Sequence, residues 1–361
     1  MATSPCYVTG TRIATARGEV AVEYLAVGDC AVTAAGRVRP ICWIGHRRIA
    51  CRTYGHLQEV MPVRVAEGAF GPGRPGRDLM LSPGHCVCVD VLGEVLIPII
   101  ALVNSATIEQ IEVEHVTYWH VELDSHDILL AEGMPAESYL DMGNHGFFSQ
   151  GSPAPSVVGI QASPDAGPAA RTYADYCRPY RASGALIAVL RERLREQALA
   201  LGWRLKPDSW TGTHLLVDGA RVDPEVEGLR GRFAMPAGAR DVWLVSDTSV
   251  PSHVGESSDE RMLGVSVEGL HVDDGVETAR SVDLTDPLLC VGFHHIEDGP
   301  RRWTAGRARL PRALWARCRG AWSLRLDLTA SALPRWRAPG GTISGPTRSQ
   351  QGAGCVEQHI A

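Results

Sequence analysis

The sequence is poor in positive charge and contains a single lysine, Lys206. Lys and Arg together number 35 against 41 Asp and Glu, which gives a formal net charge of −6 at pH 7. An acidic balance disfavours polyanionic partners, so we expect neither nucleic acid nor an anionic membrane surface as a partner. No apolar run approaches the roughly 20 residues that cross a bilayer, so we also expect no membrane span.

The sequence also lacks an export signal and a disulfide pattern. The first five residues, Met-Ala-Thr-Ser-Pro, contain neither a charged n-region nor an apolar h-region, so we expect no conventional signal peptide. The cysteines are too scattered for a disulfide framework, so reduced thiols are expected. We therefore predict a cytoplasmic protein, or one exported without a conventional signal peptide. The 10 cysteines are Cys6, Cys30, Cys42, Cys51, Cys86, Cys88, Cys177, Cys290, Cys318 and Cys355.

The length of 361 residues, of which 45% are hydrophobic, predicts two domains that each bury a core. Residues 10–76 form short alternating segments separated by turns that contain glycine. The strand-like pattern continues over 79–90, 95–98, 107–113 and 117–123. Such short, regularly spaced segments favour an all-β domain over βαβ units.

Around residues 143–170 the composition changes to Gly, Ser, Pro and Ala, which is typical of a boundary between domains. All residues that we consider for the chemistry below precede it, so we expect the N-terminal domain to fold and act without the rest. We predict four segments: an N-terminal domain at 1–148, a linker at 149–170, a C-terminal domain at 171–338 and a disordered tail at 339–361.

The C-terminal domain is predicted to open with one amphipathic helix over 183–201. Leu186, Leu190, Leu194 and Leu201 form its apolar stripe, and Arg and Glu occupy the other side. Further strands are then expected, and we predict a second, β-sandwich-like domain. The predicted strands lie at 215–217, 242–245, 263–267, 288–293 and 324–328.

A cysteine near the start of the sequence precedes a turn and an alternating strand. Cys6 is followed by the turn Thr9-Gly10 and by a predicted strand over 11–15. A thiol is a good nucleophile only as the thiolate, and its reference pKa is about 8.5, so it needs a helper group. A candidate helper lies in Leu-Ser-Pro-Gly-His, residues 81–85. Without a helper, a cysteine at such a position is usually a small buried hydrophobic residue.

Three blocks of the sequence resemble the Hint family, the self-processing domain shared by inteins and the C-terminal part of Hedgehog proteins. In the second block Ser82 stands three residues before His85, and the closing block, residues 126–139, resembles the Hedgehog version with its final Ala-x-Ser-Tyr. The resemblance covers about residues 6 to 145. The opening block is carried by Cys6-Tyr7, Gly10-Thr11-Arg12-Ile13, Thr15, Gly18-Glu19, Val22-Glu23, Leu25 and Gly28-Asp29.

This resemblance implies a compact Hint-type β fold and an autoprocessing reaction that uses no metal or organic cofactor. In that reaction the Cys6 side chain attacks the carbonyl of Pro5 and converts the backbone amide into a thioester. By motif, His85 is the general acid, Ser82 helps to hold His85 or the peptide, and His126 assists the second acyl transfer.

The sequence departs from the splicing members of the family. Splicing needs a terminal His-Asn pair followed by Cys, Ser or Thr, whereas this sequence has Asn144-His145-Gly146. The segment before Cys6 is short, and Pro5 stiffens the backbone at the scissile carbonyl. We therefore predict cleavage before Cys6 without splicing, with water or a small nucleophile as acyl acceptor. The alternative is a non-catalytic surface or carbohydrate-binding protein in which the Hint domain is a silent scaffold.

Two further groups of residues lie in or beside the motifs. His85, Cys86 and Cys88 resemble part of a metal site, but a strand directs His85 and Cys86 to opposite faces and no further ligand pair completes a zinc shell, so we predict no metal site. His120 and Asp127 lie where some Hint members place an acidic or histidine partner. The sequence leaves open which of the two occupies that place.

The densest polar and aromatic cluster of the C-terminal half surrounds Trp303. Together with His294 and Arg302, Trp303 would form a platform for a carbohydrate ligand, because aromatic rings stack on the apolar faces of sugars. The alternative is that Trp303 and Phe293 belong to the core.

Overall fold

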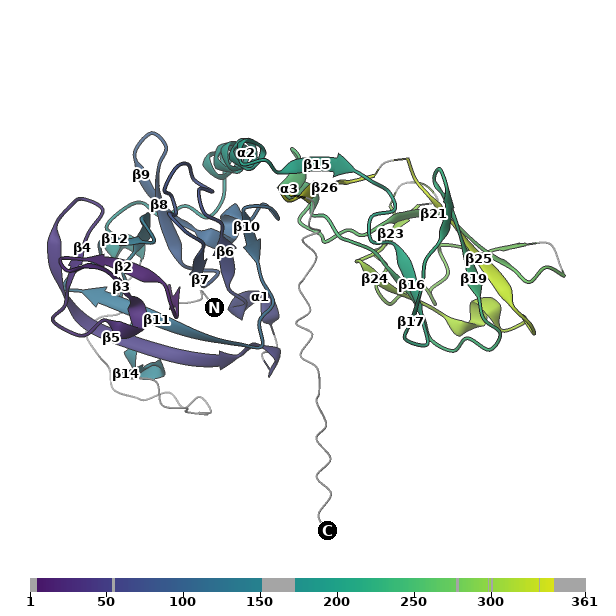
Figure 1. Cartoon of the computed structure of the whole chain (residues 1–361), viewed down its shortest axis with the longest axis horizontal. Helices are drawn as coiled ribbons and strands as arrows, with labels where there is room; N and C mark the ends of the chain where they lie inside the picture. The colour runs from purple at the N-terminus through teal and green to yellow at the C-terminus, as the bar shows by residue number, and fades with distance from the viewer. Residues whose placement is uncertain are drawn as a thin grey trace, which may run out of the picture.

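The computed structural model describes residues 5–53, 56–150, 173–276, 279–297, 299, 301–330 and 332–340. They form two β-rich bodies (Figure 1). The all-β prediction is confirmed, because antiparallel strands dominate both bodies. No helix within the described ranges is both long and apolar enough to cross a membrane. The predicted linker at 149–170 and tail at 339–361 lie almost entirely outside the described residues.

The N-terminal body is a 14-stranded antiparallel network. Its strands are β1 (Tyr7–Val8), β2 (Arg12–Thr15), β3 (Gly18–Ala21), β4 (Cys30–Val32), β5 (Val38–Ala50), β6 (Val63–Val65), β7 (Leu79–Leu81), β8 (Cys86–Asp90), β9 (Glu94–Pro98), β10 (Ile108–Gln110), β11 (His115–Leu123), β12 (Ile128–Ala131), β13 (Met134–Glu137) and β14 (Ser149–Gln150). They follow the order β10-β6-β7-β1-β11-β5-β4-β2-β12-β13-β8-β9, with β14 on β5 and β3 on β2. Its helices are short: η1 (Val22–Tyr24), η2 (Cys51–Thr53), α1 (Leu57–Val60), η3 (Ile99–Leu102) and η4 (His145–Phe147).

The short strand β1 lies between β7 and β11, and this pairing decides what surrounds Cys6. Tyr7 is the register partner of Leu81 on one side and of Trp119 on the other. Because both pairings are antiparallel, the residue before Tyr7 lies beside the residues that follow these two partners. Tyr7 is fully buried, so a shift of β1 by one residue would expose its ring and is disfavoured.

The segment 79–90, predicted as one strand, is divided by a turn. β7 ends and β8 begins on either side of Ser82-Pro83-Gly84-His85, and the N–H of His85 donates to the carbonyl of Ser82 at 3.0 Å. Pro and Gly favour such a turn, since Pro presets its φ angle and lacks an N–H for the ladder. The turn carries two of the predicted site residues to the end of β1.

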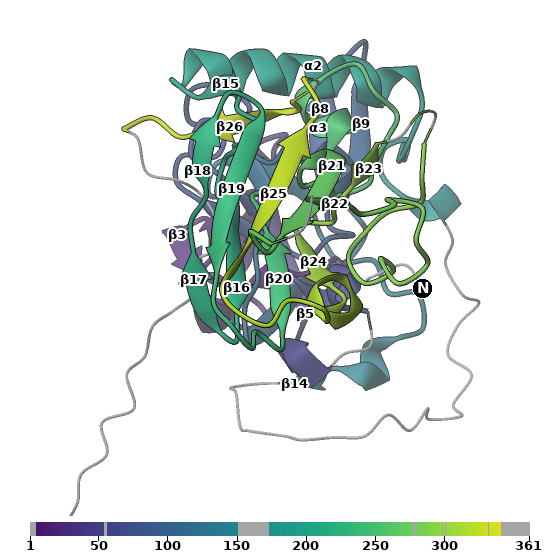
Figure 2. The same cartoon turned by 90° about the vertical axis from the view of Figure 1, so that its right-hand side faces the viewer.

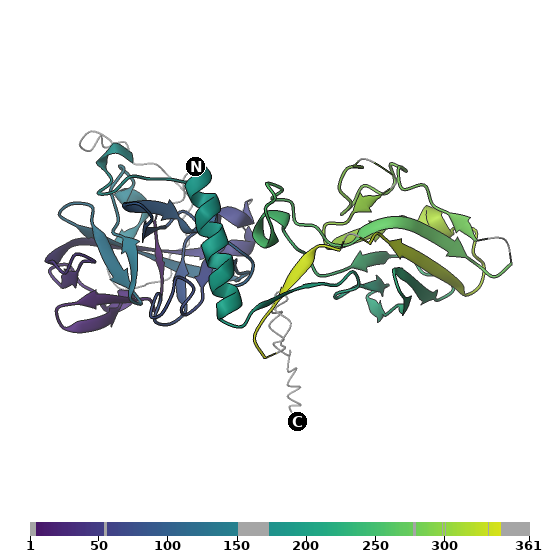
Figure 3. The same ribbon diagram turned by 90° about the horizontal axis from the view of Figure 1, so that it is seen from above.

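The predicted helix is present as α2 (Ala185–Ala200), but it packs on the N-terminal body. Its buried side chains Ile187, Leu190 and Leu194 belong to the same apolar cluster as the N-terminal strands, and Arg191 Nε donates to the carbonyl of Ala101 at 2.9 Å. Figures 1 and 3 show the helix lying across this body. The predicted assignment of the helix to the C-terminal domain is therefore wrong. An apolar stripe shows that a helix buries one face, but not which body covers it.

The C-terminal body is a β-sandwich. One sheet has the order β17-β16-β20-β24, and the other has β18-β19-β25-β21-β22 with β23 on β21 (Figure 2). Apolar side chains from both sheets form one core, which is the arrangement of a sandwich. The strands are β15 (Arg204–Pro207), β16 (His214–Val217), β17 (Ala220–Val222), β18 (Glu225–Glu227), β19 (Arg230–Met235), β20 (Val242–Val245), β21 (Ser266–Asp273), β22 (Arg280–Ser281), β23 (Arg302–Trp303), β24 (Arg307–Leu310), β25 (Trp322–Leu328) and β26 (Pro334–Arg337). The short helices are η5 (Tyr173–Asp175), α3 (Pro251–Val254) and η6 (Arg312–Trp315).

Strand β15 precedes the sandwich in the sequence and β26 follows it, and the two pair as a two-stranded ribbon. The strand predicted at 288–293 is instead a series of turns, in which the Asp286 carboxylate accepts the N–H of Leu288 at 2.8 Å. Leu288 itself is 52% exposed. The apolar residues of this segment predict a strand. The segment forms turns instead, because the Asp286 side chain binds the backbone N–H two residues further on.

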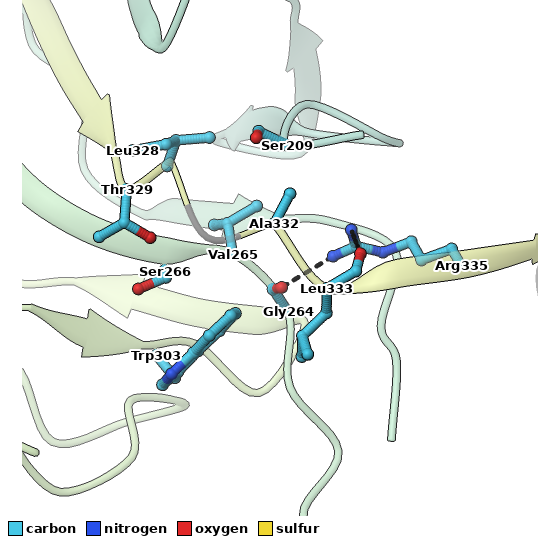
Figure 4. A pocket seen from close by; sticks show the side chains of 10 residues that line it. All are labelled: Ser209, Gly264, Val265, Ser266, Trp303, Leu328, Thr329, Ala332, Leu333 and Arg335. Atoms are coloured by element: carbon cyan, nitrogen blue, oxygen red, sulfur yellow. Dashed lines mark hydrogen bonds between the residues drawn. The ribbon is translucent and has the colours of Figure 1, made fainter. Parts of the chain in front are cut away.

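The proposed carbohydrate platform is not present. Trp303 is only 7% exposed, and the pocket that it lines beside Arg335 has a volume of about 10 Å³ (Figure 4). That space holds about one water molecule and no sugar ring. The Arg302 guanidinium lies 5.5 Å from the centre of the Phe293 ring, and its Nε donates to the carbonyl of His294 at 2.7 Å. These residues hold the sandwich together, as the core alternative predicts.

Replacement of Leu190 by Ala should destabilise the N-terminal body. Leu190 is 5% exposed, and Leu→Ala changes in a core cost about 2–5 kcal/mol. Val189→Ala is the matched control, because Val189 is 47% exposed on the same helix and should change the free energy of unfolding by less than about 0.5 kcal/mol. Urea unfolding with hydrogen exchange of the β5 and β11 amides would measure the difference. Equal stability of the two variants would contradict the packing.

Candidate active site

Cys6 and Ser82 hold each other through two reciprocal hydrogen bonds. The N–H of Cys6 donates to Ser82 Oγ at 3.0 Å, and the N–H of Ser82 donates to the carbonyl of Cys6 at 3.0 Å. Both residues are buried. The Ser82 hydroxyl therefore contacts the nitrogen of the Pro5–Cys6 peptide bond, the atom that an acyl shift would release.

His120 approaches the thiol from β11. Its Nε2 lies 3.3 Å from Cys6 Sγ, and its ring contacts the rings of Tyr139 and Phe148, with centroids 4.8 and 4.0 Å away. Burial lowers the pKa of His120 to about 3 and raises the pKa of the Cys6 thiol far above its usual value. The pair is thus a neutral thiol beside a neutral imidazole. With its lone pair on Nε2, the imidazole can accept the thiol proton.

His85 follows the turn after β7 and lies against Tyr7, with ring centroids 4.4 Å apart. It is 1% exposed, and among the described residues neither ring nitrogen has a hydrogen-bond partner. Burial lowers the pKa of His85 to about 4, against the opposing effects of the Glu137 carboxylate and of the Cys6 and Glu137 backbone. His85 is thus held as a neutral, buried imidazole near the backbone of Cys6.

His126 has its contacts away from the thiol. Its Nε2 lies 3.3 Å from Glu137 Oε2, and its Nδ1 accepts the N–H of Cys177 at 3.0 Å. Glu137 is fully buried, and its carboxylate accepts a hydrogen bond from the N–H of Cys86 at 2.7 Å. Its backbone carbonyl accepts a hydrogen bond from the Tyr7 hydroxyl at 2.8 Å. The structure therefore joins Cys6, Ser82 and His120 directly, whereas His126 contacts Glu137 instead.

Residues 5–143 match the family model of the Hint domain. The N-terminal body is a Hint domain. Among solved structures, the protein is similar to a triple variant of the gp41-1 intein, at 12% identity over 37% of this chain and 98% of that chain, with a TM-score of 0.27. It is also similar to a bacterial intein-like domain from Clostridium thermocellum, at 14% identity over 37% and 98% of the two chains, with a TM-score of 0.26. No curated protein matches the sequence.

Asp127 lies in a different part of the Hint domain from the thiol partner. Its Oδ2 accepts hydrogen bonds from the guanidinium groups of Arg37 and Arg39, with N–O distances of 2.6 and 2.8 Å. Burial raises the pKa of Asp127, but the two guanidiniums and the N–H of Ile128 outweigh burial and lower it. Of the two candidates that the sequence left open, His120 is therefore the one that contacts Cys6.

Cys86 and Cys88 point into a small apolar cluster with Leu96 and Ile128, while His85 lies on Tyr7. No three His, Cys, Asp or Glu side chains are grouped for a metal ion in the part of the Hint domain and sandwich that the structure describes. These cysteines are thus packing residues of β8.

Glu137 is the residue of this site that sequence reasoning missed. Its position within the closing block, directly before Ser138-Tyr139, is the one signal that marked it. No periodicity predicts that its carboxylate is buried between His126 and the N–H of Cys86, because these contacts need β13 to pair with both β12 and β8.

Acidification should destabilise the Hint domain through His85 and His120. Their pKa values in the folded state are about 4 and about 3, whereas an unfolded histidine titrates near 6.5. Between these values the unfolded state binds more protons, so stability that is present above pH 6.5 is lost as the pH falls. Each histidine contributes about 1.4 kcal/mol per pH unit over this window.

Unfolding measured from pH 7 to pH 5 should show this slope, and His120→Gln should reduce it. NMR of labelled histidine should find both rings neutral at pH 5. Titration of either ring near pH 6.5, or an unchanged slope in the variant, would contradict the assignment.

Proposed function

We propose that the Hint domain cleaves its own backbone between Pro5 and Cys6 through a thioester, without splicing. Sγ of Cys6 attacks the carbonyl carbon of Pro5 while the thiol proton passes to Nε2 of His120. The C–N bond breaks, the Cys6 nitrogen takes up one proton in place of the one lost by sulfur and becomes an amine, and Pro5 becomes a thioester on Sγ, so that overall the thiol proton moves to the nitrogen. Water or a small nucleophile then attacks the thioester carbonyl, which releases Sγ as a thiol and frees the segment that precedes Cys6.

The observation that carries this proposal is the position of Cys6 between Ser82 and His120. The acyl shift needs a proton removed from sulfur and a proton supplied to nitrogen. Nε2 of His120 lies 3.3 Å from the sulfur, and Oγ of Ser82 lies 3.0 Å from the nitrogen. A buried neutral thiol is a poor nucleophile by itself, so an adjacent base is the feature that makes attack feasible.

His85 is proposed as the general acid for the departing nitrogen. Burial lowers its pKa to about 4, so the ring is neutral at rest and must first gain the proton that sulfur loses before it can donate one; the Glu137 carboxylate offsets part of the effect of burial and stabilises the charged ring. His126, which contacts the same carboxylate, is proposed to assist the second acyl transfer. The Glu137 carboxylate thus raises the pKa of both histidines.

Thiol treatment should release the residues that precede Cys6. Dithiothreitol and hydroxylamine attack thioesters, so either reagent should convert the full-length protein into a form that begins at Cys6. Intact mass and N-terminal sequencing would follow the reaction.

Cys6→Ala should abolish this release while circular dichroism stays unchanged, and Cys30→Ala, which removes an exposed thiol, serves as the matched control. Equal release from the wild type and Cys6→Ala would exclude a thioester on Cys6. No release from the wild type would favour the silent scaffold.

His85→Ala and His120→Ala should each slow the release by at least about 100-fold, the low end for the loss of a general acid or base. The rate is measured by intact mass, and the melting temperature of each variant is measured beside it. If activity falls only in proportion to the folded fraction, the residue is a core histidine without a catalytic role.

A further inference from the structure

Residues 176–181, here called the strap, lie beyond the matched residues 5–143 and yet pair with the Hint domain. The N–H of Leu96 donates to the carbonyl of Pro179 at 2.9 Å, and the N–H of Arg181 donates back to the carbonyl of Leu96 at 2.9 Å. Arg178 Nε also contacts Glu94 at 2.5 Å. The strap thus covers the free edge of β9, the last strand of the network.

The first residues of the strap enclose His126. The N–H of Cys177 donates to His126 Nδ1 at 3.0 Å, and the Tyr176 ring stacks on the imidazole with centroids 4.8 Å apart and an interplanar angle of 15°. The His126 side chain is 1% exposed. Two neighbours from outside the Hint domain therefore decide how this ring is held.

The strap hydrogen bond also decides where the ring proton lies. A backbone N–H is only a donor, so Nδ1 of His126 must present a lone pair, and the proton then lies on Nε2, directed at Glu137 Oε2 at 3.3 Å. Burial lowers the pKa of His126, but the Cys177 side chain and Glu137 outweigh burial and raise it to about 9, which by itself favours a positively charged ring near neutral pH. The Cys177 N–H opposes that charge, because a proton on Nδ1 would face a second donor. We therefore assign the neutral form with Nε2–H.

We propose that the strap is a positioning element of the Hint site, which holds His126 in the Nε2–H form through the Cys177 N–H and the Tyr176 ring. This proposal rests on the autoprocessing function assigned to Cys6. Its consequence is that processing depends on residues that follow the Hint domain in the sequence. The strap is followed directly by α2, which packs on the same core, so docking of this region and competence of the site are coupled.

Two substitutions in the full-length protein, Cys177→Pro and Cys177→Ala, distinguish the effect of the Cys177 N–H hydrogen bond from that of the Cys177 thiol. Proline has no N–H, whereas alanine keeps the N–H and removes only the sulfur. We expect thiol-induced release to be at least about 10-fold slower in Cys177→Pro than in Cys177→Ala. Equal rates in the two folded variants would overturn the proposal.

A spectroscopic readout keeps the test independent of cleavage. In the Cys6→Ala background, ¹⁵N-labelled histidine should report His126 as Nε2–H, with a mixture of forms in Tyr176→Ala and the original form restored in Tyr176→Phe, which keeps the ring. An unchanged His126 signal in both Cys177→Pro and Tyr176→Ala would refute the role of the strap. If the wild type never cleaves but the tautomer follows the strap, the proposed function fails and the positioning role stands.

Discussion

The pairing of the two-residue strand β1 with β7 and β11 is the constraint on which the site depends. Tyr7 fits one register because its ring is buried and its hydroxyl is bound by the Glu137 carbonyl. The register of Tyr7 also fixes the neighbours of Cys6. Ser82 directly follows the end of β7 and His120 directly follows Trp119 on β11, so both lie beside Cys6. The reciprocal hydrogen bonds between Cys6 and Ser82 then hold the peptide nitrogen at a hydroxyl group.

Burial gives this site its electrostatic character. The Cys6 thiol and the side chains of His85 and His120 are all held in their neutral forms, because a low-dielectric interior disfavours charge. A site of this kind keeps the thiol neutral at rest, and charge forms only when protons move between neighbouring groups. Glu137 is the buried carboxylate beside His85 and His126, and it contacts donors from the backbone of Cys86 and the ring of His126.

The Hint core extends beyond the residues that carry the Hint motifs. The helix α2 contributes three side chains to this core, and the strap closes the edge of β9 and the ring of His126. The second half of the sequence is thus made of two parts with different attachments, one packed on the Hint domain and one forming the sandwich. A boundary drawn from composition alone separates residues that the packing joins.

The sequence by itself determined the all-β class, the amphipathic helix and the Hint blocks that contain Cys6, Ser82 and His85, because these features are written in local patterns of alternation, period and motif. Only the tertiary structure decided that His120 rather than Asp127 meets the thiol, that the buried Glu137 carboxylate contacts His126, that α2 covers the Hint core and that Trp303 is buried. The reason is physical: the contacts of Cys6 with Ser82 and His120 join residues 76 and 114 positions apart in the sequence. Such contacts are set by strand register and by which apolar faces meet, and neither is expressed in any single stretch of sequence.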